Sequence, residues 1–302
     1  MSTVKKYLSL IKFSHTIFAM PFAMIGFFLG FRIFQAGGIA NYSYRETFSS
    51  VFREKWLVFL LVIACMVFAR SAAMAFNRYL DRHFDAKNPR TAVREIPAGI
   101  LKADRVLWFT IINALLFIIC TYFINPLCFY LSPVALLVIL GYSYTKRFTA
   151  LCHIILGLGL SLAPIGAYLA VTGKFDVLPI LFSFAVIFWV SGFDIIYALQ
   201  DEEFDRDHNL YSIPSQLGKR KALRVSELLH VASTACVVAA GLYGGFGYLY
   251  WAGVGVFAGM LLYQHNIVKP DDLRRVNLAF MTANGIASVV FAVLVIADLF
   301  LF

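Results

Sequence analysis

Long apolar segments alternate with short polar ones along the chain, and this pattern predicts membrane-spanning helices. An α-helix needs roughly 20 apolar residues to cross the hydrocarbon core of a bilayer. On that measure we identify about nine spans, at residues 14–35, 56–76, 104–124, 126–143, 151–172, 177–198, 222–243, 246–264 and 276–300. No linker divides the chain. The sequence therefore predicts an all-α, polytopic membrane protein with a single domain over residues 1–302.

Two very short connections indicate which spans are neighbours. The third and fourth spans are separated by Asn125-Pro126, and the seventh and eighth by Gly244-Gly245. Because such short turns leave no room for a crossover, each pair is expected to pack antiparallel.

A first group of polar residues closes the second span at helical spacing. Asp81 and Asp85 are four residues apart and would share one face of a helix, with Asn77 one turn before them. Arg70 lies two turns before Asn77, inside the span, where an ionised side chain usually faces a cavity or a partner. The alternative for Arg70 is a side chain that extends to the membrane surface.

A second group, at Asp194, Tyr197, Asp201 and Asp205, repeats this helical spacing at the end of the sixth span. Facing carboxylates repel one another unless a divalent cation lies between them, and oxygen ligands suit Mg²⁺, which also binds substrate phosphates. Solvated loop charges are the alternative, but the repeated spacing favours a site that handles a diphosphate. The predicted Mg²⁺ ligands are Asp81, Asp85, Asp201 and Asp205.

Charge orients the spans and excludes one class of partner. Most of the 26 Lys and Arg residues lie in the N-terminal tail and in the connections after the second, fourth, sixth and eighth spans. The positive-inside rule then places both acidic groups in the cytoplasm and the C-terminus outside. The net charge of +9 is scattered over membrane loops, so we expect contact with anionic lipid and phosphate and no nucleic acid.

Composition agrees with a membrane protein and adds no second site. Hydrophobic residues make up 61% of the chain and charged residues only 14%, whereas soluble domains are about a quarter charged. The five cysteines all lie in apolar segments, and the six histidines show no spacing typical of zinc ligands.

Several cations follow the acidic groups closely. Lys87, Arg90 and Arg94 follow the first group, and Lys146 and Arg147 follow the fourth span. Guanidinium and ammonium groups would bind the diphosphate oxygens that a metal does not reach. The alternative is that they serve only as positive flanks of cytoplasmic loops.

The two acidic segments resemble the aspartate motifs of the UbiA superfamily of intramembrane aromatic prenyltransferases. The first motif has the form Asn-x-x-x-Asp-x-x-x-Asp and matches residues 77–85. The second has the form Asp-x-x-Tyr-Ala-x-x-Asp-x-x-x-Asp and matches residues 194–205. The arginine directly after Asn77, Arg78, makes the first motif resemble that of the 4-hydroxybenzoate branch of the superfamily.

This resemblance implies a nine-helix bundle with a central cavity, Mg²⁺ held between a diphosphate and both motifs, and an opening to lipid. It implies transfer of a polyprenyl group from polyprenyl diphosphate onto an aromatic acid such as 4-hydroxybenzoate, as in ubiquinone biosynthesis. A related branch prenylates a dihydroxynaphthoate in a menaquinone route, and this alternative stays open. The implied location is a bacterial-type inner membrane, with the site facing the cytoplasm.

The same resemblance implies roles for single residues. We expect Asp194 and Tyr197 to shape the site or polarise the acceptor, with Arg70 as a third candidate catalytic residue. The expected substrate-binding residues are Asn77, Arg78, Lys146 and Arg147.

Two other function classes give different expectations. A cation transporter is the main alternative, yet its acids would lie near the middle of the membrane and not at one face. A non-catalytic lipid-binding scaffold would not need two polar stripes.

The charge pattern predicts where the C-terminus lies. A reporter fused after Phe302 should show an external location, since nine spans starting in the cytoplasm end on the opposite side. Protease protection in spheroplasts or an alkaline phosphatase fusion measures this directly. A cytoplasmic reporter would contradict the predicted number of spans.

Overall fold

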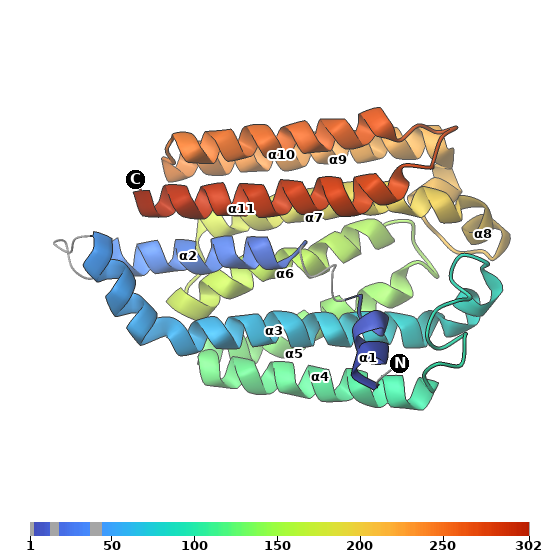
Figure 1. The fold of residues 1–302 in the computed structure, drawn as a ribbon, viewed down its shortest axis with the longest axis horizontal. Coiled ribbons are helices and arrows are strands. Elements are labelled where there is room, and N and C mark those ends of the chain that lie inside the picture. Colours follow the sequence, from blue (N-terminus) through green and yellow to red (C-terminus); the bar gives the residue numbers. More distant parts are fainter. Residues whose placement is uncertain (1–2, 13–17, 37–43, 302) are drawn as a thin grey trace.

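The computed structural model describes residues 3–12, 18–36 and 44–301, which fold almost wholly into helices that run side by side in one bundle (Figure 1). The first half of the chain forms α1 (Thr3–Leu10), α2 (Met20–Ala36), α3 (Tyr44–Lys87), α4 (Ala103–Ile124), α5 (Pro126–Thr145) and α6 (Cys152–Thr172). The second half forms α7 (Val177–Ala198), η2 (Leu199–Asp201), α8 (Glu202–Asp207), α9 (Ile213–Gly244), α10 (Tyr248–Ile267), the π-helical segment η3 (Leu278–Ala283) and α11 (Asn284–Leu301).

The predicted all-α bundle of about nine spans is confirmed for the described residues. Seven of their helices are long and apolar enough to cross a membrane, namely α3, α4, α5, α6, α7 with η2 and α8, α9, and η3 with α11. The shorter α2 and the less apolar α10 lie alongside them (Figure 1). Residues 14–17 of the predicted first span lie outside the described residues, as does Phe302.

The helices differ from the predicted spans mainly in length. The span expected at 56–76 belongs to α3, which has 44 residues and carries Asp81 and Asp85 beyond its apolar part. The short helix α1 was not predicted. The turn at Asn125-Pro126 joins α4 to α5 as expected, and the Asn125 side chain accepts a hydrogen bond from Cys128 N at 2.8 Å.

Helix α7 lies at the centre of the packing, with α6 and α9 as its main neighbours. Its buried aromatic side chains meet those of α2, α10 and α11 in one cluster, which includes Phe22, Phe182, Trp189, Phe257 and Phe291. Glycine allows the close contact between α6 and α7, because a Cβ on Gly157 would lie 2.5 Å from the carbonyl oxygen of Ile187.

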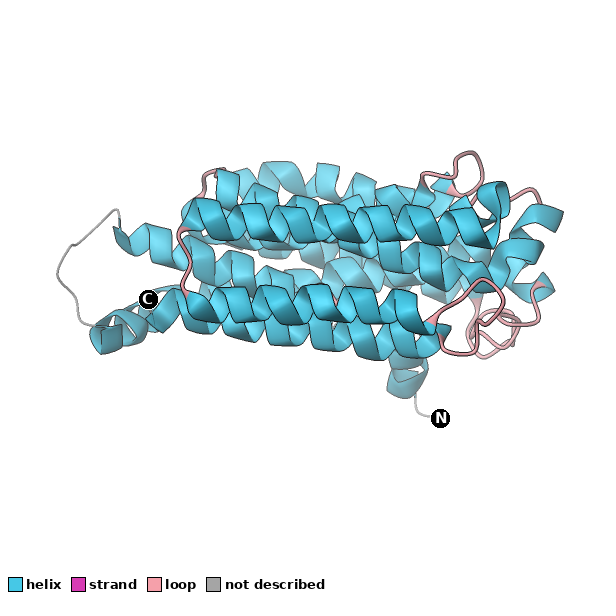
Figure 2. Cartoon of the chain, turned by 90° about the horizontal axis from the view of Figure 1, so that it is seen from above, coloured by secondary structure: helices cyan, strands magenta, loops and turns pink. Residues whose placement is uncertain are grey.

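The two ends of the bundle have different characters. Figure 2, seen from above, shows the connecting loops gathered at the ends, with the helices between them. The C-terminal end of α3, the loop at 88–102 and α8 share one end, whereas α11 finishes at the other (Figure 1). Both acidic groups therefore lie at the same end of the bundle, as a shared site requires.

A buried amide supports the π-helical segment η3. The Asn284 side chain donates to the carbonyl oxygens of Ala279 and Phe280, at 3.2 and 3.1 Å. It accepts from Trp189 Nε1 at 2.9 Å and from Gln264 Nε2 at 2.8 Å. These contacts tie η3 to α7 and α10 and fix where Phe280 lies.

Asp298 offers a test of helix capping in the bundle. Its side chain is 0% exposed and accepts hydrogen bonds from Gly247 N at 2.8 Å and Tyr250 N at 3.2 Å, at the start of α10. Asp298→Ala should destabilise the protein by about 1–3 kcal/mol, because two backbone N–H groups at the start of α10, one of them buried, lose their acceptor. Thermal unfolding in detergent measures the loss. Asp271→Ala, at an exposed position, is the control and should change stability little; equal stability of both variants would contradict the capping role.

Candidate active site

One cavity of about 840 Å³ brings together residues from both acidic groups. Ten of the eleven side chains predicted for the site line it, namely Arg70, Asn77, Arg78, Asp81, Asp85, Lys146, Asp194, Tyr197, Asp201 and Asp205. The eleventh, Arg147, contacts Asp81 at its edge. Helices α3, α5, α6 and α7 supply most of the walls.

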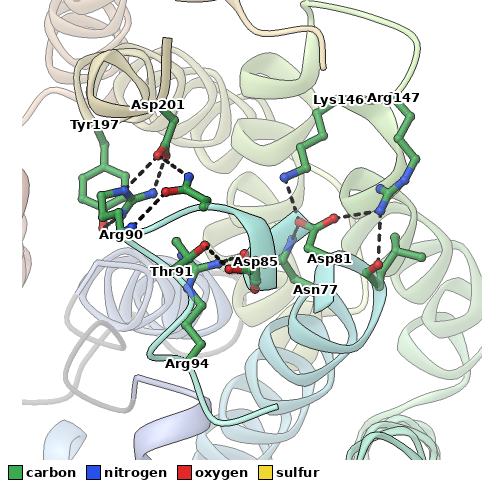
Figure 3. Close-up of polar contacts among 12 residues, drawn as sticks. Asn77, Asp81, Asp85, Arg90, Thr91, Arg94, Lys146, Arg147, Tyr197 and Asp201 are labelled. Atoms are coloured by element: carbon green, nitrogen blue, oxygen red, sulfur yellow. Dashed lines mark hydrogen bonds and ion pairs between the residues drawn. The ribbon is translucent and has the colours of Figure 1, made fainter. Parts of the chain in front are cut away.

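Asp81 is held by cations from the end of α5. Its Oδ1 lies 2.8 Å from Arg147 Nη2 and its Oδ2 lies 3.0 Å from Lys146 Nζ (Figure 3). Asn77 Nδ2, one turn earlier on α3, donates to Asp81 Oδ2 at 3.2 Å. The predicted helical stripe is therefore present, and the two loop cations face it.

Asp201 is held by the loop that follows α3. Arg90 donates to Asp201 from Nε, at 2.9 Å, and from Nη2, in a two-pronged contact (Figure 3). Asn88 Nδ2 adds a third hydrogen bond at 3.0 Å, and Arg90 Nη1 donates to Tyr197 Oη at 3.1 Å. Burial works against the Arg90 charge, but the hydrogen bonds and proximity to Asp201 outweigh it and raise the pKa of Arg90.

Asp85 has one oxygen in use and one open. Arg94 Nη1 donates to its Oδ1 at 2.7 Å, while its Oδ2 is buried and has no hydrogen-bond partner. Because a buried carboxylate oxygen is costly to leave unpaired, this atom indicates a missing cationic or hydrogen-bonding ligand.

The donor set fits Mg²⁺, although no ready-made cage exists. Among the described residues, no three His, Cys, Asp or Glu side chains gather closely enough to hold an ion. Mg²⁺ usually takes only one or two carboxylates and fills its shell with water and substrate phosphates, so a cage is not required. Carboxylate oxygens of both acidic groups line one cavity, and Asp85 Oδ2 is open to a ligand. The predicted ligand set stays a prediction.

Asp194 has a different partner from the other carboxylates. Its Oδ2 lies 2.7 Å from His153 Nδ1, at the start of α6. No sequence pattern points to this histidine, because it stands alone in an apolar segment and its partner is 41 positions away. The sequence pattern indicates Arg90 and Arg94 only as possible phosphate ligands and does not predict their contacts with carboxylates.

Two arginines on α3 reach the cavity with unused donors. The Nε atoms of Arg70 and Arg78 are buried and have no hydrogen-bond partner. Arg70 Nη2 donates to the carbonyl oxygen of Lys12 at 3.3 Å. These guanidinium groups therefore have free donors for an anionic group of a substrate.

The rest of the cavity is apolar and extends away from the charged end. On α5 its lining continues from Lys146 to Cys128, near the opposite end of the bundle, and Ile124 and Phe175 also line it there. The cavity thus combines a charged mouth with a long apolar body.

Comparison with known proteins explains this combination. The sequence model of the UbiA prenyltransferase family matches residues 47–286. The chain is 30% identical, over 79% of its length and 83% of the relative's, to a protein from Tolumonas auensis named 4-hydroxybenzoate octaprenyltransferase.

Solved structures have the same fold. The apo structure of a UbiA homolog from Aeropyrum pernix K1 matches with a TM-score of 0.76 and 26% identity, covering 94% of this chain and 96% of that one. A UbiA homolog from Archaeoglobus fulgidus, bound to DMAPP and Mg²⁺, matches with a TM-score of 0.69 and 20% identity, covering 98% and 100%.

The variant Arg70→Lys tests whether Arg70 binds a substrate or only extends to the membrane surface. An ammonium group cannot replace a planar guanidinium that binds an anion with two donors. We expect kcat/KM to fall by about tenfold to a hundredfold for one substrate, the effect of losing a charge-assisted hydrogen bond. Steady-state kinetics with each substrate varied in turn measures this loss.

The matched control is Arg82→Lys on the same helix. Arg82 lies outside the cavity lining, with its guanidinium over the Tyr79 ring at 4.4 Å. It should keep near-normal kinetics. Near-normal kinetics of Arg70→Lys as well would remove Arg70 from the site.

Proposed function

Since the chain belongs to the UbiA prenyltransferase family, we propose that it transfers a polyprenyl group from polyprenyl diphosphate onto an aromatic acid such as 4-hydroxybenzoate. The chain is an integral membrane prenyltransferase. The identity of the acceptor and of the prenyl donor is the proposed part. It rests on the name of the relative from Tolumonas auensis and on the chemistry of the cavity.

The observation that carries the proposal is the division of the cavity. Its charged mouth contains the cations and carboxylates that a diphosphate and its metal need, and its body contains apolar side chains suited to an isoprenoid chain. A polyprenyl diphosphate has the same division, with an anionic head and a long hydrocarbon tail.

The cations at the mouth bind and orient the diphosphate. Lys146, Arg147, Arg90 and Arg94 each contact a carboxylate in this structure and can turn their remaining donors to phosphate oxygens. The residues that would hold Mg²⁺ are Asp81, Asp85, Asp201 and Asp205, in line with the Mg²⁺ bound to the homolog from Archaeoglobus fulgidus. The chemistry that the metal supplies when bound is neutralisation of negative charge on the departing diphosphate.

Departure of the diphosphate leaves an allylic cation on the prenyl group, and this cation must be protected from water. Tyr197 and Phe280 line the cavity beside the mouth, with ring centroids 4.3 Å apart. Aromatic faces attract cations, and the apolar walls exclude water, so a cation formed here is kept for the acceptor.

The acceptor needs a partner for each of its two polar groups. We assign its carboxylate to the free donors of Arg70 and Arg78 and its hydroxyl to Asp194. The hydroxyl then increases the electron density of the ring carbon beside it, which forms the new carbon–carbon bond.

The direct test is product analysis with a mixed panel of substrates. Purified protein in liposomes is given 4-hydroxybenzoate, a dihydroxynaphthoate and several polyprenyl diphosphates with Mg²⁺, and products are identified by mass spectrometry. Prenylated 4-hydroxybenzoate is the expected product. A prenylated dihydroxynaphthoate alone would place the protein in the menaquinone route, and no product would contradict the proposal.

Asp81→Ala and Asp201→Ala should each abolish turnover while the protein still accumulates folded in membranes. Each variant removes a carboxylate from the mouth of the cavity, where α3 and η2 do not depend on it for apolar packing. EDTA should stop the wild-type reaction, and added Mg²⁺ should restore it. Wild-type rates in either variant would falsify the ligand assignment.

A further inference from the structure

His153 links three helices at the wall of the cavity. It is 3% exposed, near the start of α6, and its Nδ1 lies 2.7 Å from Asp194 Oδ2 on α7. Its Nε2 lies 3.3 Å from the backbone nitrogen of Ile213, the first residue of α9. Both residues line the cavity, but His153 is almost fully buried and both of its ring nitrogens are directed at protein groups.

The contact with Ile213 fixes the proton on the imidazole ring. A backbone N–H can only donate, so Nε2 must accept and therefore has no proton. The neutral ring then has its proton on Nδ1 and donates it to Asp194. Ser212 and Ser215 form a capping box at the start of α9, which fixes the Ile213 N–H that sets this tautomer.

The result is a carboxylate with one oxygen occupied and one available. His153 occupies Oδ2, and within the described chain no hydrogen bond reaches Oδ1 of Asp194. The Asp194 side chain is 24% exposed, and this exposure is to the cavity, since Asp194 is one of its lining residues.

We propose that His153 is a positioning residue, which holds Asp194 so that Oδ1 accepts the hydrogen bond of the acceptor's hydroxyl. This inference rests on the proposed function and adds a residue to it. The C1–O electron pair leaves with the diphosphate, which leaves the allylic cation. The ring carbon then bonds to C1 of the prenyl group while the hydroxyl proton passes to Asp194. The ring carbon then loses its proton to the released diphosphate, and Asp194 returns its proton to the oxygen.

Two amide substitutions separate this role from simple packing. In His153→Asn the amide nitrogen lies near the place of Nδ1, so the donor to Asp194 is kept and the partner of Ile213 is lost. In His153→Gln the amide reaches the place of Nε2, so the partner of Ile213 is kept and the donor to Asp194 is lost. A packing role predicts no preference for Asn over Gln.

We expect kcat to fall by about tenfold to a hundredfold in His153→Gln, from loss of one charge-assisted hydrogen bond, and by less in His153→Asn. The KM for the polyprenyl diphosphate should stay unchanged in both. The loss in His153→Gln should be smaller with 3-fluoro-4-hydroxybenzoate than with 4-hydroxybenzoate, because a more acidic hydroxyl needs less help from Asp194.

His83→Asn, at an exposed position on α3, is the control and should behave as wild type. Equal kinetics of the Asn and Gln variants, or an equal loss with both acceptors, overturns the role of His153 and leaves the proposed function intact. A wild-type protein that forms no product from either acceptor overturns the proposed function itself.

Discussion

The structure depends on charge neutralisation at the mouth of an otherwise apolar cavity. Asp81 and Asp201 each contact a cation from a distant part of the chain, and Asp85 contacts Arg94 of the adjoining loop. These pairs join α3, the loop at 88–102, the end of α5 and η2. An unpaired charge in such surroundings costs several kcal/mol, so each pair also determines where its loop lies. The loops at the mouth are thus held by the same groups that we propose for the reaction.

Because the same ion pairs hold the loops and supply the proposed substrate-binding groups, substrate binding has a cost. In the proposed reaction, a diphosphate would compete with Asp81 and Asp201 for Lys146, Arg147 and Arg90, and each exchange would leave a carboxylate without its cation. A divalent cation that arrived with the diphosphate would replace the lost positive charge, so the proposal implies that metal and diphosphate favour each other's binding. Asp194, the proposed partner of the acceptor, contacts His153 and takes no part in these ion pairs.

Helical periodicity was enough to predict the first polar stripe, because Asn77, Asp81 and Asp85 stay on one helix to Lys87. The second group does not stay on one α-helix, since the chain passes from α7 through the 3-10 turn η2 into α8. Apolar length was enough to predict the bundle. The pairing of Arg90 with Asp201 could not be predicted, since side chains of an irregular loop follow no period. His153 was missed for another reason: its role depends on α7 and α9, which contact α6 only in the folded bundle.

The π-helical segment η3 sets the position of Phe280 against Tyr197, and a π-turn accommodates one residue more than an α-turn. Removing one residue between Phe280 and Asn284 would return the segment to α-helix and rotate the preceding side chains, including Phe280, by about 100° around the helix axis. Phe280 would then leave the cavity wall, although every remaining residue kept its identity. In evolutionary terms, the number of residues in η3 determines this part of the cavity wall. Insertion or deletion of a residue in η3 therefore reshapes the wall more readily than substitution does.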